Sequence, residues 1–552
     1  MNTLNKEQSV AVMSDDKKIL CLAGAGTGKT FSMIERIARL VSSGVDPASI
    51  LALTFTNAAA FEMRSRFQNR CKGCTIPEFR TFHSFCYSLM AVDKEVRRKL
   101  GYTQMPSLAT DSNKKQIEKL AGMQIGVHLS QRKMSGDDPL TEADKYNLRL
   151  IEKARARIMK SHNVITFQLL LSKVCELFIN KDPVVQKYID RFKYIFVDEF
   201  QDTDPLQWKF VQTFEDASIF IVGDAQQAIY AFRGADSSII KELACDKSWK
   251  VIRLTQNYRS SENICKFANA FTAKYADASY RVAICSTSDG PDVDTTMVPR
   301  RIMDTVKYSK TSVVPEYILN ELKTYLDTFP KDCAVLCRTN AEVQSIQTFL
   351  NTHNMPYVTA KRNVFGVHVL KSVLDDDYCL NWLSTMLTAD NYAEYIRLKT
   401  IKEEEDDTFT LNDFYIKFSK VGAVVQGMDM VNTVRSICRE HRPIKDRYHD
   451  ILNIIGCPGL DVDISKCTKL SEFLQTMIDG LECPDSPTSE IYVGTIHSVK
   501  GLEYESVVVV GAGGPRFQLN DEQNNNLLYV AITRAKKNLR LYVAGQEDRY
   551  EK

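Results

Sequence analysis

The sequence predicts an α/β protein built on parallel β-sheets, with mainly helical segments inserted between the strands. The first observation is a Gly-rich loop at 23–30, which stands between an apolar run at 18–22 and a helical pattern that extends towards Leu40. The second is that polar residues directly follow three further apolar runs, at 50–53, 194–197 and 219–222. Because ligands bind at the carboxyl ends of parallel strands, these four runs are expected to share one sheet.

The third observation is that helical periodicity interrupts this pattern. A Leu-, Lys- and Arg-rich region extends from Phe85 to about residue 191 and includes a helical stretch at 149–160. It therefore looks like an insertion between two strands of the first sheet.

A second α/β pattern begins near 333–337 and resumes at 506–510 and 539–543. A second insertion, at roughly 376–486, separates its two parts, and its acidic run at 403–407 is most simply a solvated turn or helix end. The chain is thus expected to hold two similar α/β halves.

Size and composition narrow the class of protein. A chain of 552 residues is too long for a single core, and its 44% hydrophobic and 25% charged content is typical of a globular protein. No apolar run is long enough to cross a bilayer, and the N-terminus has no signal-peptide core. We therefore expect a soluble intracellular protein, in cytoplasm or nucleus. The net charge of +2 (71 basic minus 69 acidic residues) does not by itself indicate nucleic-acid binding.

The fifteen cysteines are scattered. Cys71 and Cys74 form a lone C-x-x-C pair, whereas a structural zinc site needs about four ligands. Reduced thiols are therefore favoured over zinc, and no structural zinc is expected.

The Gly-rich loop has the composition of a phosphate cradle. It differs from G-x-x-x-x-G-K-[ST] only in its first residue, and its members are Ala23, Gly24, Ala25, Gly26, Thr27, Gly28, Lys29 and Thr30. Backbone N–H groups would face the phosphates, Lys29 would reach the terminal ones, and the Thr30 hydroxyl would hold Mg²⁺. A Gly-rich turn without a ligand is the less favoured alternative, because the Gly-Lys-Thr ending lies between a strand and a helix.

An acidic pair follows the apolar run at 194–197. Phosphoryl transfer to water needs a carboxylate on Mg²⁺ and a group that orients or deprotonates the water. Asp198 suits the metal role and Glu199 the water role. Adjacent acidic residues are common on surfaces, but this pair ends a predicted buried strand in a chain that also has a phosphate loop.

The segment 223–234 follows the next predicted strand and combines an amide with an aromatic and basic group. Gln227 could contact the γ-phosphate and its water. Tyr230, Phe232 and Arg233 lie a few residues further on, and such rings stack on bases of any sequence. A purely structural role is credible for one of the rings and less so for both.

Two arginines stand after predicted strands or at helix edges, Arg259 and Arg534. An Arg that reaches transition-state charge can accelerate phosphoryl transfer. Taken alone, either arginine is more simply a surface salt bridge.

In this order, the motifs resemble those of the UvrD/Rep family of superfamily 1 DNA helicases over nearly the whole chain. The resemblance implies that Gln8 reads the adenine edge, that Tyr258 stacks on adenine, that Arg259 and Arg534 are arginine fingers, and that Glu503 contacts the nucleotide. The residues that it implies for DNA contact are Phe55, Asn57, Thr81, His83, Tyr230, Phe232, Arg233, Thr495, His497 and Lys500. The run Gln523-Asn524-Asn525-Asn526 replaces the family's usual acidic-then-basic run, so local salt bridges there are expected to be lost.

The resemblance also implies an organisation in two RecA-like domains, with ATP and Mg²⁺ in the cleft between them. The first domain is expected at 1–85 and 191–267 and the second at 268–375 and 487–552, with accessory insertions at 86–190 and at 376–486, the latter reduced. The implied activity is ATP-dependent 3′→5′ translocation on single-stranded DNA with unwinding of duplexes, in replication, repair or recombination. Single-strand/duplex junctions and replication or repair proteins are the implied partners.

Two alternatives stay open. One is a DNA-binding subunit with a decayed ATPase, which the presence of Lys29, Asp198, Glu199 and Arg534 disfavours. The other is a helicase of the same superfamily that acts on RNA or with opposite polarity.

Overall fold

The computed structural model describes residues 4–109, 141–161, 163–298, 316–329, 331–359, 364–384, 409–440, 442–455, 470–482, 491–514 and 517–544, with a few short stretches between them. The acidic run at 403–407 lies outside the described residues. The chain divides into two compact units, one formed by 1–82, 178–360 and 485–552 and the other by 83–177 and 361–484.

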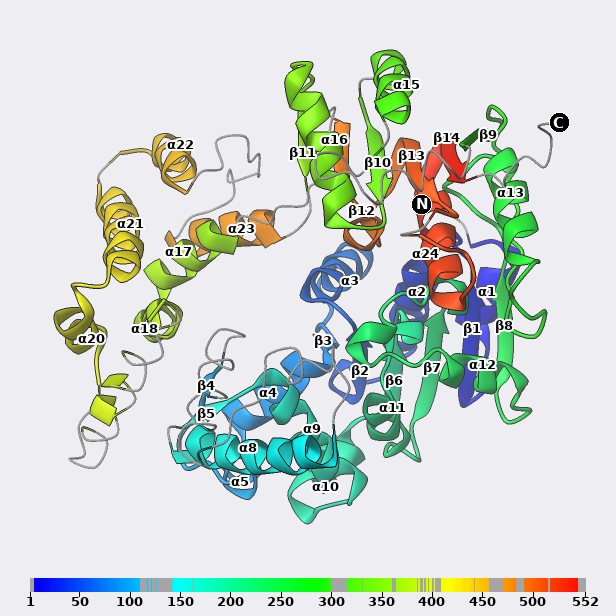
Figure 1. Ribbon diagram of the computed structural model, residues 1–552. Coiled ribbons are helices and arrows are strands. Elements are labelled where there is room, and N and C mark those ends of the chain that lie inside the picture. The colour runs from blue at the N-terminus through cyan, green and yellow to red at the C-terminus, as the bar shows by residue number, and fades with distance from the viewer. Residues whose placement is uncertain are drawn as a thin grey trace. The chain divides into compact units, whose positions relative to one another are not determined.

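The first unit contains two six-stranded parallel sheets, which confirms the predicted fold class (Figure 1). The order of the first sheet is β3-β2-β6-β7-β1-β8. Its strands are β1 (Lys18–Ala23), β2 (Ile50–Thr54), β3 (Glu78–Thr81), β6 (Tyr194–Val197), β7 (Ser218–Gly223) and β8 (Lys250–Leu254). Every residue of β2 is buried, which is typical of a parallel strand covered on both faces. The four strands predicted around the Gly-rich loop therefore do share one sheet.

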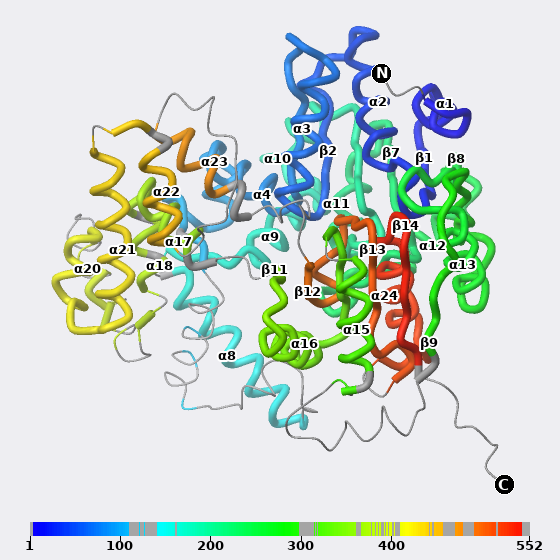
Figure 2. The backbone as a smooth tube through the Cα atoms, turned by 90° about the horizontal axis from the view of Figure 1, so that it is seen from above, coloured from blue at the N-terminus to red at the C-terminus, as the bar shows by residue number. Residues whose placement is uncertain are grey.

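The second sheet has the order β11-β12-β10-β13-β14-β9 and is also parallel throughout. Its strands are β9 (Asp294–Val298), β10 (Cys333–Cys337), β11 (Tyr357–Thr359), β12 (Ile491–Thr495), β13 (Tyr504–Ala512) and β14 (Ala535–Ala544). Figure 2 shows β9 beside β14, although the two are far apart in the chain. This sheet confirms the second α/β pattern; β9, β11 and β12 were not among the predicted strands.

Helices connect the strands of both sheets. Those of the first unit are α1 (Lys6–Met13), α2 (Lys29–Ser42), α3 (Asn57–Arg70), α10 (Pro183–Arg191), α11 (Pro205–Gln212), α12 (Ser238–Cys245), α13 (Glu262–Thr272), α15 (Glu316–Thr328), α16 (Asn340–Thr352) and α24 (Glu522–Ile532). Local sequence explains several of their starts: α1 and α16 begin with capping boxes, at Asn5 with Gln8 and at Thr339 with Glu342. Helix α2 buries Met33, Ile34 and Ile37 in the core of the first sheet.

The second unit is mainly helical, and its one sheet in the described residues pairs β4 (Ser107–Leu108) with β5 (Val164–Ile165). Its helices, two of which begin or end at the unit's border, are α4 (Phe82–Val92), α5 (Lys94–Lys99), α8 (Glu142–Ser161), α9 (Phe167–Ile179), α17 (Val364–Leu374), α18 (Asp376–Ser384), α20 (Leu411–Phe418), α21 (Gly422–Arg439), α22 (Ile444–Ile454) and α23 (Leu470–Glu482). One apolar cluster joins residues of both insertions, among them Ile151, Leu383 and Phe473. Among the described helices of the chain, none combines the length and apolar character that a bilayer span requires.

Candidate functional site

The Gly-rich loop connects β1 to α2 through backbone conformations that favour glycine. Gly26 and Gly28 have φ angles of 69° and 81°, in the left-handed region. The Thr27 hydroxyl donates to the Gly24 carbonyl over 2.8 Å. A Cβ atom at Gly24 would lie 2.3 Å from Ile284 Cγ2, so even alanine would force a shift there. The loop is thus held in one shape at the N-terminus of α2, where backbone N–H groups lack partners within the helix.

Side chains from distant parts of the sequence hold this loop from outside. Gln8 Nε2 donates to the Thr27 carbonyl over 3.1 Å, and Asn257 Nδ2 donates to the Ala25 carbonyl over 2.7 Å. The backbone N–H of Tyr258 donates to the Gly26 carbonyl over 2.9 Å, while the Tyr258 side chain stays 59% exposed. The structure therefore brings the predicted adenine contacts, Gln8 and Tyr258, to the phosphate loop.

The acidic pair lies at the carboxyl end of β6, facing the start of α2. Thr30 Oγ1 donates to Asp198 Oδ2 over 2.9 Å. Burial and the neighbouring charge of Glu199 raise the pKa of Asp198 to about 7. Burial would also raise the pKa of Glu199, but the charges of Lys29 and Lys500 outweigh it and lower that pKa to about 2. The two adjacent carboxylates thus lie in different electrostatic environments, which move their pKa values in opposite directions.

Polar side chains at the end of β7 complete this edge of the first sheet. Gln227 Nε2 donates to Asp224 Oδ2 over 2.7 Å, and the Asp224 N–H donates to Gln201 Oε1 over 3.0 Å. Gln201 Nε2 in turn donates to Glu199 Oε2 over 2.5 Å. Asp224 and Gln201 were not predicted as site residues, although Asp224 directly follows β7 and Gln201 lies shortly after the acidic pair that ends β6.

Arg534 reaches the first sheet from the second. Its side chain is almost fully buried, and it donates to the carbonyls of Val530 and Leu502 over 3.0 and 3.1 Å. Its Nη2 lies 3.5 Å from Gln227 Oε1. Burial, assisted by the charge of Arg259, lowers the pKa of Arg534 to about 9. A negatively charged group bound next to this guanidinium would therefore stabilise its charged form.

Arg259 pairs with Glu503 over 2.6 Å and donates to the Thr533 carbonyl over 3.2 Å. Glu503 also contacts Lys536 over 3.4 Å. Burial would raise the pKa of Glu503, but these two cations outweigh it and lower the pKa. Arg259, which follows β8 of the first sheet, thus lies beside Glu503 and Arg534 of the second, as the motif order predicts.

An aromatic cluster lies next to this site, and its members follow β2, β7 and β12. Phe55 stacks on Tyr230 with ring centroids 5.1 Å apart, and Phe232 meets the edge of His497 at 5.5 Å. The Arg233 guanidinium lies 5.1 Å from the centre of the Tyr230 ring and 5.5 Å from that of Phe232. Phe232 is 62% exposed, so this ring has a surface available to a base.

The other predicted DNA contacts are less clustered. Thr81 Oγ1 approaches Asn57 Oδ1 at 3.4 Å, which places two of them together at the start of α3. Thr495 ends β12, and its carbonyl accepts a hydrogen bond from Ser498 over 2.6 Å. His83 belongs to the second unit, where its ring meets Phe167 edge-on at 5.9 Å.

Lys500, which the resemblance implies as a DNA contact, is largely buried. Its side chain is only 9% exposed, and its ammonium pairs with Asp202 over 2.5 Å. It also donates to the Gln227 carbonyl over 2.9 Å. Because these contacts occupy the ammonium inside the protein, Lys500 joins the second sheet to the first instead of presenting its charge on an open surface.

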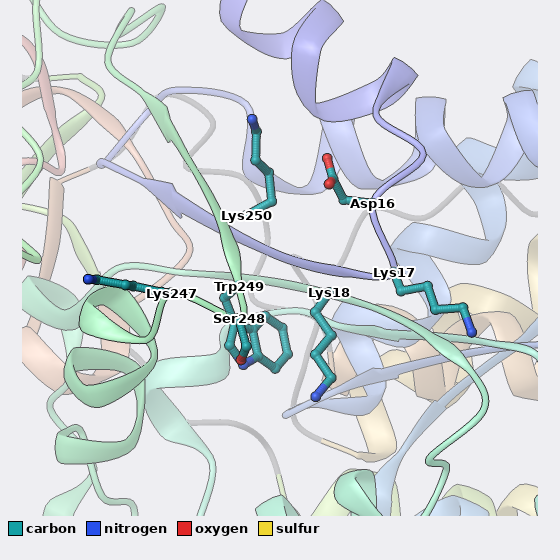
Figure 3. Close-up of a pocket in the computed structure, with 7 residues that line it drawn as sticks. All are labelled: Asp16, Lys17, Lys18, Lys247, Ser248, Trp249 and Lys250. Atoms are coloured by element: carbon teal, nitrogen blue, oxygen red, sulfur yellow. The ribbon is translucent and has the colours of Figure 1, made fainter.

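A depression of about 370 Å³ lies at the opposite, amino-terminal edge of the first sheet (Figure 3). It is lined by Asp16, Lys17, Lys18, Lys247, Ser248, Trp249 and Lys250. Figure 3 shows the four lysine side chains pointing in different directions, so they do not converge on one ligand. This depression is not the predicted nucleotide site.

The C-x-x-C pair ends α3, with Cys71 buried and Cys74 exposed, both as free thiols. Within the described part of the chain, no cluster of three or more His, Cys, Asp or Glu side chains could hold a metal ion.

Comparison with known proteins matches three family models to the chain. Residues 4–248 match the UvrD/REP helicase N-terminal domain, and residues 252–368 and 490–542 match UvrD-like helicase C-terminal domains. Similar proteins include the putative ATP-dependent DNA helicase YjcD of Bacillus subtilis, 27% identical over 98% of this chain and 78% of the relative. The ATP-dependent DNA helicase PcrA of Staphylococcus epidermidis is 25% identical over 97% and 83%, and DNA helicase II of Haemophilus influenzae is 26% identical over 100% and 85%. Because these family models together match most of the chain, the chain belongs to the UvrD/Rep family of superfamily 1 DNA helicases.

Proposed function

We propose that the protein is an ATP-dependent DNA translocase that moves 3′→5′ along single-stranded DNA and unwinds duplexes in replication, repair or recombination. The observation that carries this proposal is the composite site. Arg534 of the second sheet approaches Gln227 of the first, and Gln227 precedes the ring of Tyr230 by three residues. A site shared between two sheets can change its geometry with the nucleotide, as stepping along a strand requires. The names of PcrA and DNA helicase II support the same activity.

ATP would lie against the phosphate loop, between the two sheets. Lys29 and the loop N–H groups would bind the phosphates, Gln8 and Tyr258 would contact the adenine, and Glu503 would also contact the nucleotide. Arg259 and Arg534 would meet the charge that develops on the γ-phosphate. Arg534 suits this role because its guanidinium is already desolvated and held by carbonyl groups.

Thr30 and Asp198 would hold Mg²⁺, which supplies charge neutralisation to the phosphates when bound. Their hydroxyl and carboxylate oxygens lie 2.9 Å apart and are the hard ligands that this cation prefers. Burial and the charge of Glu199 raise the pKa of Asp198 although Lys29 acts against them, and the charge of a divalent cation would favour the ionised carboxylate further. The residues present therefore fit the cation.

Glu199 and Gln227 would then handle the attacking water. Glu199 would be ionised, because Lys29 and Lys500 favour its charged form, so its carboxylate can accept a hydrogen bond from the water and orient it. The Gln201 amide fixes the orientation of the Glu199 carboxylate. Gln227, held by Asp224, would align the water beside the γ-phosphate.

The DNA would pass over the aromatic cluster, with bases on the exposed ring of Phe232 and next to Phe55, Tyr230 and His497. Arg233 would supply positive charge next to these rings. Such stacking tolerates any sequence, as a translocase needs.

Strand displacement tests the proposal directly. Duplexes with a 3′ or a 5′ single-stranded tail are incubated with and without ATP and Mg²⁺, next to an RNA version of each tail. Displacement that needs ATP and a 3′ DNA tail is the expected result. Displacement from 5′ tails alone would overturn the polarity, preference for RNA tails would overturn the substrate, and ATP-independent binding without displacement would identify a decayed ATPase.

A further inference from the structure

Helix α1 carries one residue of the proposed adenine site, and the residue before it contacts the other. Gln8 in the first turn of α1 lies against the phosphate loop. Asn5, which directly precedes the helix, donates through Nδ2 to the hydroxyl of Tyr258 over 2.8 Å, although the two residues are 253 positions apart. A side chain at the start of the chain thus holds the ring that is proposed to stack on the base.

This contact fixes a side chain that is otherwise open to solvent. Tyr258 is 59% exposed, and its backbone N–H donates to the Gly26 carbonyl over 2.9 Å. The backbone bond holds the main chain but leaves the side-chain torsions free. A hydrogen bond at the far end of the ring selects one of the rotamers that an exposed tyrosine adopts. The orientation of the ring relative to the phosphate loop therefore depends on Asn5.

The Asn5 amide is shared between this ring and the start of α1. Its Oδ1 accepts from the Gln8 N–H over 2.7 Å, and Gln8 Oε1 accepts from the Asn5 N–H over 3.1 Å. This capping box uses only the oxygen of the amide, and serine caps a helix as well as asparagine does. The amide nitrogen is not needed for the cap, so the contact with Tyr258 is a separate use of the same side chain.

Glu7 connects the same helix to the segment that carries the ring. Its Oε2 accepts from the Thr255 N–H over 2.7 Å, and its Oε1 accepts from the Thr255 hydroxyl over 2.6 Å. Thr255 directly follows β8 and lies three residues before Tyr258. At the other end of α1, the Arg36 guanidinium donates over 2.7 to 3.2 Å to three backbone carbonyls, those of Ala11, Val12 and Ser14. The helix is therefore held at both of its ends.

We propose that Asn5 and Glu7 are positioning residues for the nucleotide base, which fix the Tyr258 ring relative to Gln8 before ATP binds. This inference rests on the proposed function and adds to it two residues that need not touch the nucleotide themselves. When the ring is already held, ATP binding does not have to order an exposed side chain, and that ordering would weaken the affinity. The phosphates are bound by other groups, so the effect is confined to the base.

The test begins with Asn5→Ser in the full-length chain, which keeps the cap and removes the contact with the ring. Steady-state ATP turnover is measured at saturating oligo-dT, together with inhibition by inorganic tripolyphosphate, which carries no base. The KM for ATP should rise about 3- to 10-fold, while kcat and the inhibition constant of tripolyphosphate should stay within about twofold. Tyr258→Phe removes the same hydrogen bond from the other side and should have the same effect. The double variant should be no worse than either single variant, because only one interaction is lost.

A rescue variant and two controls sharpen this test. Asn5→Asp should keep a KM closer to that of the unmodified chain, because a carboxylate can cap the helix and also accept from the Tyr258 hydroxyl. Thr255→Val removes one of the two hydrogen bonds to Glu7 and should also raise the KM without lowering kcat. Asn69→Ser changes an exposed asparagine of α3, and Tyr146→Phe changes a tyrosine that is 63% exposed. Both controls should keep the unmodified KM.

An unchanged KM in Asn5→Ser or in Tyr258→Phe would overturn the inference, and so would increases that add up in the double variant. An equal rise in the inhibition constant of tripolyphosphate would overturn it as well, because the phosphate loop itself would then have changed. If thermal unfolding shows that Asn5→Ser does not fold, Tyr258→Phe and Thr255→Val decide the outcome. Absence of ATP turnover in the unmodified chain would instead refute the proposed function.

Discussion

Replacing Phe232 by alanine isolates the proposed base platform from the fold. The ring is 62% exposed, meets His497 only edge-on, and has the Arg233 guanidinium 5.5 Å from its centre. Removing an exposed side chain of this kind changes stability by only about 0.5 kcal/mol or less. Loss of one stacked base costs about 1–3 kcal/mol of binding free energy. At 25 °C this corresponds to a dissociation constant for single-stranded DNA that is about 5- to 150-fold higher.

The neighbouring ring of Tyr230 is less exposed than that of Phe232 and makes more contacts within the protein. Its ring contacts both Phe55 and the Lys500 ammonium, so Tyr230→Ala should lower stability as well as weaken DNA binding. Replacing both rings should impair translocation more than ATP binding.

Fluorescence anisotropy with labelled oligo-dT at several salt concentrations measures the effect of Phe232→Ala. The slope of affinity against salt should stay constant, because no phosphate contact is removed. Ile416→Ala, which removes an apolar side chain that is 68% exposed, is the matched control and should bind dT normally. Unchanged dT affinity in Phe232→Ala would show that no base stacks on this ring. A fall in thermal stability as large as the loss of binding free energy would show that Phe232 supports the fold instead.

Three further predictions concern the nucleotide site and its surroundings. Lys29→Ala should abolish ATP hydrolysis but leave DNA binding measurable, and unchanged turnover would show that the loop does not hold the phosphates. Glu199→Gln should lower ATP turnover by about 10²- to 10⁴-fold while a fluorescent analogue still binds, whereas lost analogue binding would argue against a water-handling role. Burial, with the charge of Arg338, lowers the pKa of His497 from 6.5 to about 4. Below pH 6.5 the unfolded chain therefore binds a proton at His497 that the folded protein does not bind. The free energy of unfolding should be unaffected by this residue above pH 6.5 and should decrease as the pH falls from 6.5 to 4. Thermal unfolding should show a smaller acid-side decrease in His497→Gln, and an identical decrease would contradict this origin.

Local patterns predicted much of the first sheet. The apolar run at 18–22 corresponds to β1 (Lys18–Ala23), and the helix after the loop begins at Lys29. These features depend on neighbouring residues: side chains buried on both faces of a strand, and glycines that permit left-handed backbone. Strand β9 is different, because its sequence carries little apolar signal and it is held by register with β14.

Long-range polar contacts were harder to predict. The Asp224 N–H donates to Gln201, and Asn526 donates to the Ala225 and Ala228 carbonyls, and only the fold brings these partners near each other. An Asn or Asp side chain can cap a helix, hold a turn or contact a ligand. Which of these it does depends on the partner that the fold brings to it. Asp224 could have been predicted as a site residue, because it directly follows the strand β7. Nothing about the position of Asn526 in α24 indicated its partners.

The sequence by itself predicted the phosphate loop and the acidic pair, because each is a short pattern whose chemistry follows from residue type and spacing. The roles of the two distant arginines came only from the resemblance to a family, since an isolated arginine is more simply a surface salt bridge. Tertiary structure alone decided how these parts meet. It placed Arg534 near Gln227 and buried the ammonium of Lys500 against the carboxylate of Asp202. The physical reason is that the environment of a charged side chain depends on which surfaces exclude water from it, and here those surfaces come from two different sheets.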